Sequence, residues 1–160
     1  MPERLGENGF DEVDFVISTN PGEPMKALVQ VASGGELSRI MLALKTVLAE
    51  KDQIDTLIFD EIDAGISGKT AWKVSEKMAE LSKKHQIISI THLPQIAAMA
   101  DHHFVIEKKV EDLKTKTEIT KLEEEPIIEE LSRMLGGELI TEAVRNNARE
   151  MKTQANVRKS

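Results

Sequence analysis

The chain has 160 residues, of which 40% are apolar and 31% charged, and it contains no cysteine. A chain of this size can bury the core of one domain, and without cysteine it has no disulfide, thiolate metal ligand or thiol nucleophile. The formal net charge of −7 opposes tight binding to nucleic-acid phosphates, and four Phe with one Trp are too few for a base-stacking surface.

Two short strands are predicted before a glycine-rich turn. Residues 12–19 alternate polar and apolar side chains and are followed by Asn20-Pro21-Gly22, a pattern typical of a half-buried strand and a turn. A second strand is expected over residues 27–31. Ser33-Gly34-Gly35 then opens a helix over residues 36–50, in which apolar residues recur at intervals of three and four.

The middle of the chain alternates apolar strands with a helix. Strands are predicted at residues 56–59 and 86–90, with a helix over residues 69–84 between them. The run TLIF at residues 56–59 is continuously apolar, as expected for a parallel strand covered on both faces, and residues 86–90 predict a second buried strand. The first strand ends in Asp60-Glu61 and the second in Thr91-His92. Because parallel strands bring their carboxyl ends to one edge of a sheet, these polar residues should lie together.

The remaining elements form the C-terminal part of the same lobe. In order, we expect a short helix at 94–100, hairpin strands at 103–109 and 115–122 on the edge of the sheet, and helices at 127–135 and 138–151. The two last helices are separated by Gly136-Gly137, which indicates a hinge. The sequence therefore predicts a mixed α/β lobe over residues 1–153, with a largely parallel sheet flanked by helices, and a disordered tail over residues 154–160.

The first candidate site is Ser33-Gly34-Gly35-Glu36. A helix that begins after serine and two glycines exposes several unpaired backbone N–H groups, for which an anionic phosphate is a natural partner. A capping box explains the same residues without any ligand, since Ser33 can cap the helix and Glu36 can reach back to it. The motif alone leaves both interpretations open.

The second candidate site combines Asp60 and Glu61 with His92. Adjacent carboxylates at the end of a buried strand can divide two tasks, one holding a metal ion while the other orients a water. Acidic residues also end strands simply as solvated groups, and a lone histidine is often a bystander. Asp101, His102 and His103 could extend the set into a metal cluster, but adjacent strand residues point to opposite faces.

One further segment imitates a phosphate-binding loop. Residues 65–70 end in Gly-Lys-Thr between a strand and a helix, as in the pattern G-x-x-x-x-G-K-[ST]. The position of the first glycine is occupied by Asp63, and Asp60 and Glu61 lie in the same loop. Three carboxylates would repel a triphosphate, so we do not interpret this segment as the nucleotide cradle.

The order of these motifs resembles the second half of an ATP-binding-cassette ATPase. The matching segments are Ala32–Glu36 for the signature motif, Leu57–Glu61 for Walker B, Ile62–Ile66 for the D-loop, and His92 for the switch histidine. Spacings of about 25 and 30 residues fit one helix plus one strand each. Alanine at position 32 and glutamate at position 36 depart from the usual leucine and glutamine, and both departures look shared with the RecN and SMC branch.

Four segments are similar in sequence to the bacterial RecN family, whose members are relatives of the SMC ATPases. These segments are STNPGEP, VASGGELSRIMLALK, IFDEIDAGISG and ITHLPQIAAMADHHFVIEK. The resemblance implies the C-terminal part of an ATPase head that uses ATP and Mg²⁺ when assembled. It also implies three partners, namely an N-terminal Walker A lobe of the same protein, a second head in a homodimer, and DNA bound by the full-length protein.

The resemblance assigns a role to each candidate residue. Asp60 would hold magnesium through water, Glu61 would activate the attacking water, and His92 would sense the γ-phosphate. The residues implied to lie against the nucleotide of a second head are Ser33, Gly34, Gly35, Glu36 and Asp63, with Asp63 at the dimer seam. The implied parent protein acts in DNA double-strand break repair and recombination, and this lobe alone should be inactive because it has no Walker A motif.

Other functions stay open at this stage. The residues Asp60, Glu61 and His92 could instead serve a stand-alone metal-dependent hydrolase, or the lobe could be a non-catalytic dimerisation module. A transporter ATPase is disfavoured, because the stretch before the signature lacks a helical region to meet a membrane partner. The sequence has no run of roughly 18 apolar residues and no apolar leader, so we expect a cytoplasmic protein without a membrane partner. The resemblance implies that it is nucleoid-associated.

Overall fold

The computed structural model describes most of the chain. The described residues are 9–11, 13–18, 22, 24–31, 33–51, 53–111 and 114–159. Ala32, most of the turn expected at residues 20–22 and the turn expected near Asp112 lie outside them. The lobe expected over residues 1–153 divides into two compact units, Met1–Ser33 and Gly34–Ser160.

The first unit contains an antiparallel pair, β1 (Val16–Ile17) and β2 (Lys26–Ala27), followed by one helical turn, α1 (Leu28–Val31). The strand expected over residues 12–19 is present only as β1, and its two end residues lie outside the described part of the chain. The strand expected over residues 27–31 is wrong after its first residue. A short apolar run fits a helical turn as well as a strand, and periodicity alone does not separate them.

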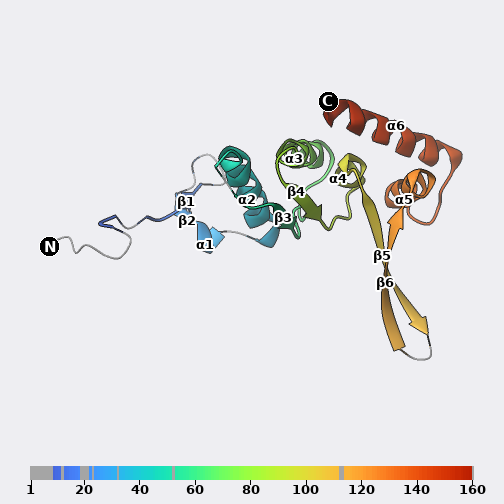
Figure 1. Ribbon diagram of the computed structural model, residues 1–160, viewed down its shortest axis with the longest axis horizontal. Coiled ribbons are helices and arrows are strands. Elements are labelled where there is room, and N and C mark those ends of the chain that lie inside the picture. The colour runs from blue at the N-terminus through green and yellow to red at the C-terminus, as the bar shows by residue number, and fades with distance from the viewer. Residues whose placement is uncertain are drawn as a thin grey trace. The chain divides into compact units, whose positions relative to one another are not determined.

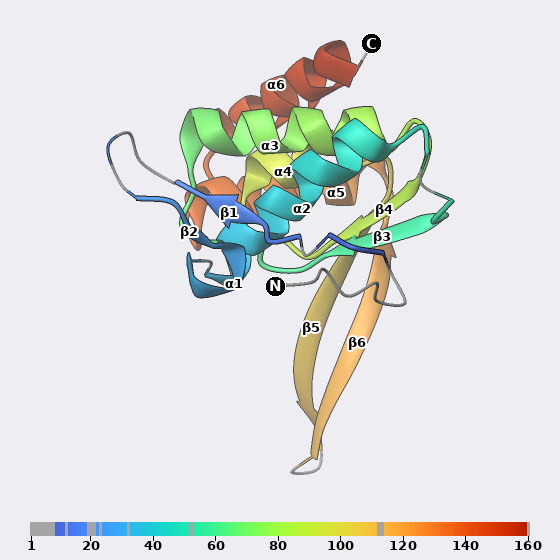
Figure 2. The ribbon, with the colours of Figure 1, turned by 90° about the vertical axis from the view of Figure 1, so that its left-hand side faces the viewer.

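The second unit is built on two parallel strands, β3 (Thr56–Phe59) and β4 (Gln86–Ser89). The helices α2 (Gly34–Leu48) and α3 (Gly68–Leu81) pack over one face of this pair (Figure 2). Both helices and both strands were expected within a few residues of these bounds, because their apolar periodicity is strong. The helix between the strands makes the connection a parallel crossover, as predicted.

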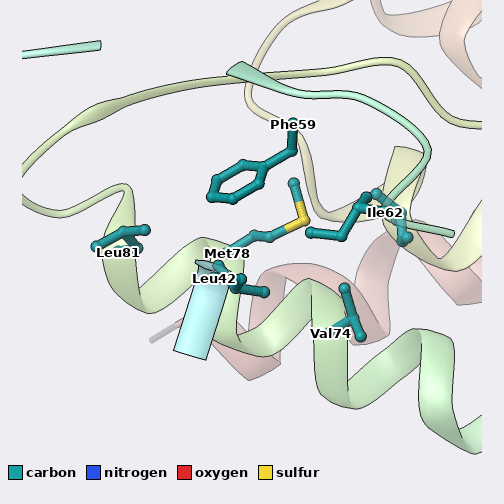
Figure 3. Close-up of a cluster of buried hydrophobic side chains, with 7 residues drawn as sticks. Leu42, Phe59, Ile62, Val74, Met78 and Leu81 are labelled. Carbon is teal, nitrogen blue, oxygen red and sulfur yellow. The ribbon is translucent and has the colours of Figure 1, made fainter. Parts of the chain in front are cut away.

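Apolar side chains from both helices and from β3 form the first core. Figure 3 shows Leu42 of α2, Phe59 of β3 and Met78 of α3 directed toward one another. The complete buried cluster is Leu42, Phe59, Ile62, Val74, Met78, Leu81 and Ile96. Burial of one such side chain contributes on the order of 1.5–3 kcal/mol, so this cluster fixes α2 and α3 on the strands.

The opposite face of the parallel pair is exposed. Ile58 retains 70% of its accessible surface, Ile88 45% and Ile90 57%. The expectation that these strands are covered on both faces is therefore wrong for this chain taken by itself. Side chains alternate along the strands, so Phe59 points into the core and Ile58 points away from it. A continuous apolar run therefore has two apolar faces, and α2 and α3 cover one of them.

The rest of the second unit is a hairpin with three helices. Its elements are α4 (Pro94–Met99), β5 (His103–Glu111), β6 (Lys114–Leu122), α5 (Glu124–Gly136) and α6 (Glu142–Lys159). The hairpin strands pair with each other and form a two-stranded sheet separate from the parallel pair. Figure 2 shows the hairpin extending away from the helices. We expected the hairpin on the edge of the parallel sheet. Among the described residues, however, β5 and β6 pair with each other and with no strand of that sheet.

A second core joins α4, α5 and α6, which lie side by side in Figure 1. Its buried residues are Ala98, Met99, Leu131, Ala148 and Ala155. The turn between α5 and α6 follows the expected glycine pair, and Gly137 has a φ of 64°, a conformation that L-residues with a side chain rarely adopt. None of the described helices is long and apolar enough to cross a membrane.

The disordered tail expected over residues 154–160 is wrong, because α6 continues to Lys159. The last turns of α6 are fixed by contacts with distant elements. Arg158 pairs with Glu76 of α3 and stacks 4.7 Å from the ring centre of Trp72. Lys159 pairs with Asp101 at 2.6 Å. The sequence of α6 is polar enough to look like a tail, and these tertiary contacts help to hold its end as a helix.

A half-buried cation links α6 to the end of α4. Lys152 Nζ donates to the carbonyls of Ala98 at 2.9 Å and Ala100 at 2.8 Å, and lies 3.3 Å from Nε2 of His103. These carbonyls belong to the C-terminal end of α4, where a cation is favoured by the helix dipole. Burial, together with the charge of Lys152, lowers the pKa of His103 to about 4. His103 is therefore neutral at neutral pH.

The stability of the chain should fall as the pH drops from 6.5 to about 4. In that window the unfolded state protonates His103, whose ordinary pKa is near 6.5, while the folded state does not until about pH 4. His103→Gln should flatten this part of the pH dependence, measured by urea unfolding at pH 7, 6, 5 and 4. His102→Gln is the matched control, because His102 is exposed. Equal pH dependence in both variants would contradict the assignment.

Candidate functional site

The parallel register places the two polar strand ends beside each other. Phe59 is paired with Ser89, and the N–H of Ile90 donates to the carbonyl of Phe59 at 3.4 Å. Asp60 and Glu61 therefore follow β3 at the edge where Thr91 and His92 follow β4. The predicted placement of these residues at one edge is confirmed by this register, whereas their chemical roles stay predictions.

Asp60 and Glu61 are both exposed, and they lie in a turn with a defined backbone conformation. Asp60 Oδ1 accepts from the N–H of Glu61 at 2.9 Å. Glu61 has a φ of 56°, which is uncommon for a residue other than glycine and costs of order 1–3 kcal/mol. Such strain is kept only where the surroundings impose it. Here the surroundings are the first turns of α2.

The N-terminal turns of α2 hold this turn from one side. Ser38 Oγ donates to the carbonyl of Asp60 at 2.8 Å. Arg39 Nη1 donates to the carbonyls of Ile62 at 3.1 Å and Ala64 at 2.8 Å. Helix α2 therefore satisfies three carbonyls of the loop after β3. Sequence reasoning missed Ser38 and Arg39, although their spacing of three and four residues from Gly35 places them on the same helix face.

The glycines of the candidate signature motif have different environments. A β-carbon on Gly35, which is buried, would lie 2.8 Å from both Ala64 Cβ and the carbonyl of Glu61. A β-carbon on Gly34, which is exposed, would meet only the flexible carboxylate end of Glu61. Gly35 therefore has a packing reason to be glycine, whereas the space beside Gly34 is occupied only by a side chain that can move.

The remaining residues of the motif lie beside these glycines in the sequence. Ser33 is exposed and is the last residue of the first unit. Glu36 is half-buried in the first turn of α2. The carboxylate end of Glu61 lies next to Gly34, so an anionic group already sits near the positive end of the α2 dipole. This arrangement is compatible with an anion site and equally with a capped helix.

Asp63 and His92 are joined directly. Asp63 is 3% exposed, and its Oδ2 accepts from the hydroxyl of Thr91 at 2.6 Å and from the backbone N–H of His92 at 2.8 Å. The same oxygen lies 2.9 Å from Nδ1 of His92. The Thr91 hydroxyl in turn accepts from the N–H of Leu93 at 3.0 Å. A buried carboxylate thus ties the loop after β3 to the loop after β4.

The other candidates do not join this site. His102 is exposed and His103 is buried against Lys152, as expected for neighbouring residues that point to opposite sides. Across the described part of the chain, no group of three or more His, Asp and Glu residues is arranged to hold a metal ion. The suggested cluster of Asp101, His102 and His103 therefore has no geometric support.

The sequence matches known proteins closely over most of its length. DNA repair protein RecN of Halalkalibacterium halodurans is 48% identical over 145 residues, which cover 91% of this chain and 26% of that protein. RecN of Bacillus subtilis is 44% identical over 155 residues, covering 97% and 27%. This chain belongs to the RecN family. It spans about a quarter of the length of the RecN proteins it matches and corresponds to their C-terminal part.

A third relative and one solved structure complete the comparison. RecN of Vibrio cholerae is 46% identical over 143 residues, covering 89% of this chain and 26% of that protein. No family profile matches the chain. A solved structure from work on ATP-driven dimerization and DNA-stimulated activation of SMC ATPases is 24% identical, with a TM-score of 0.49, covering 78% of this chain and 81% of that one.

The two glycines should respond differently to alanine. Gly35→Ala should lower the free energy of unfolding by about 1–3 kcal/mol, because its β-carbon would collide with Ala64 and the Glu61 backbone. Gly34→Ala should cost much less, since the Glu61 side chain can turn away. Urea unfolding of both variants measures the difference. Equal stability of the two variants would show that α2 does not pack on this loop as described.

Proposed function

We propose that this RecN-family chain is the C-terminal lobe of an ATPase head that acts in DNA double-strand break repair and recombination. The observation that carries the proposal is the shared edge where Asp60, Glu61 and His92 follow two parallel strands, next to the glycine turn of α2. In open α/β sheets, ligands bind outside the carboxyl ends of the strands. The RecN relatives, described as DNA repair proteins, supply the biological setting.

The chemistry of each residue fits phosphoryl transfer to water. Glu61 is exposed and can accept the proton of an attacking water, and His92 stands across the same edge. Asp60 presents an exposed carboxylate, and magnesium in nucleotide sites is held by one or two carboxylates together with water and phosphates. Asp60 would hold such an ion, which would neutralise charge on the phosphates during hydrolysis.

The exposed apolar face of β3 and β4 supports the proposal that a partner lobe binds there. Two parallel strands with one bare apolar face are an incomplete sheet, because parallel sheets are normally covered on both sides. Ile58, Ile88 and Ile90 form that bare face. An N-terminal lobe that carries Walker A would cover it and supply the lysine and backbone groups that cradle the phosphates.

The turn formed by Gly34 and Gly35 at the start of α2 supports the proposal that a second head binds. Gly34 is exposed at the start of α2, where backbone N–H groups favour an anion. Together with Ser33, Gly35 and Glu36, this turn would face the nucleotide of the other head in a homodimer. An incoming phosphate there repels the nearby Glu61 carboxylate, so Glu61 must turn away from Gly34 toward the water that it activates. ATP binding would in this way join two heads, and hydrolysis would release them from each other.

The test replaces the matching part of a full-length RecN protein with this chain. Glu61→Gln in that chimera should lower kcat for ATP by about 100-fold or more, because general-base catalysis contributes that much, while ATP binding persists. Steady-state hydrolysis and nucleotide-binding assays measure both quantities. The matched control is Glu50→Gln, since the Glu50 side chain is 85% exposed and away from the edge. Unchanged turnover in Glu61→Gln would refute the assigned role.

A further inference from the structure

One oxygen atom gathers three contacts from the loop after β4. Asp63 Oδ2 lies 2.6 Å from Thr91 Oγ1, 2.8 Å from the backbone nitrogen of His92 and 2.9 Å from His92 Nδ1. Asp63 is nearly fully buried, and a buried carboxylate is stable only when it is hydrogen-bonded. Thr91 and the His92 backbone meet that requirement. The contact with the imidazole ring is additional and therefore needs its own explanation.

The contact decides which ring nitrogen of His92 carries a proton. A carboxylate oxygen has no proton to donate and repels a lone pair, so at 2.9 Å it favours the proton of the neutral ring on the nitrogen that faces Asp63. That nitrogen is Nδ1, which leaves Nε2 as the atom available to a ligand. The His92 side chain is 72% exposed, so its outer part is accessible. The tautomer of a histidine is generally set by the group that its other ring nitrogen faces.

Asp63 is itself held rigidly by α2. Arg39 donates to the carbonyls of Ile62 and Ala64, the two residues that flank Asp63. The Asp63 backbone therefore cannot move without breaking charge-assisted hydrogen bonds, which are stronger than neutral ones. The helix that carries the glycine turn is linked through Arg39 and Asp63 to His92.

We propose that Asp63 is a positioning residue for His92, fixing its ring orientation and the Nδ1–H tautomer from within the same chain. This role differs from a contact of Asp63 with a second head, because the carboxylate is already engaged inside its own lobe. The inference rests on the proposed function in one respect only, that the atom presented outward, Nε2, faces a nucleotide.

The tautomer can be measured on this chain without any nucleotide. Long-range ¹H–¹⁵N correlation spectra of the labelled chain distinguish a protonated from an unprotonated ring nitrogen, and the spectrum of His92→Gln assigns the His92 signals. At a pH where the ring is neutral, the wild-type chain should show His92 protonated at Nδ1. This measurement needs no further variant to be decisive, and a wild-type ring protonated at Nε2 would overturn the proposal.

Substitution of Asp63 provides a second arm. Asp63→Asn should lose the Nδ1–H signal pattern in favour of Nε2–H, because an amide can donate to Nδ1. Asp60→Asn, at the same edge but without a contact to His92, should keep the wild-type pattern. Persistence of Nδ1–H in folded Asp63→Asn would also overturn the proposal. An inactive RecN chimera with an Nδ1-protonated His92 would instead count against the proposed ATPase function and leave the positioning role standing.

Discussion

Parallel pairing of β3 with β4 is the constraint on which the site depends. The pairing puts the loops after both strands on one edge, where Asp63 Oδ2 can reach Thr91 and His92. Without that register the catalytic candidates would be scattered among loops that share no contact. Helix α2 adds the second restraint, since Ser38 and Arg39 satisfy loop carbonyls that would otherwise be unpaired. The site is thus a junction of two loops and one helix end.

The same junction explains why strain is tolerated at Glu61. Its positive φ turns the chain so that the carboxylate projects outward near Gly34 while Ile62 returns into the core. Ile62 is fully buried, and its burial offsets a cost of a few kcal/mol in the turn. A strained residue that is exposed and acidic, next to a rigid support, is a geometry suited to a reacting group. Rigid supports of this kind position catalytic residues more accurately than free loops.

Much of this arrangement could be predicted from the sequence. The apolar periods of α2, α3, β3 and β4 are strong, and alternation of strand and helix is enough to predict a common edge for Asp60 and His92. Periodicity failed where a segment was short or polar. It assigned residues 28–31 to a strand, and it could not detect that the end of α6 is held by distant residues.

Contacts between residues far apart in the sequence could not be predicted from it. Arg39 and Ile62 are 23 residues apart, and Asp63 and Thr91 are 28 apart, so no local pattern relates them. The exposed face of β3 and β4 was also missed, because a run such as TLIF is apolar on both faces whether or not both are covered. Whether the second face of a strand is covered depends on the elements that pack against it, and the pattern of the strand itself does not encode them.

The central claim is that this chain completes an ATP site together with another lobe. The most direct measurement mixes the chain with a separately produced N-terminal RecN lobe that carries Walker A, and follows ATP hydrolysis alongside the association of the two lobes. The account predicts no hydrolysis by either lobe alone and clear hydrolysis by the mixture. Hydrolysis by this chain alone, or a stably associated mixture that stays inactive, would contradict it.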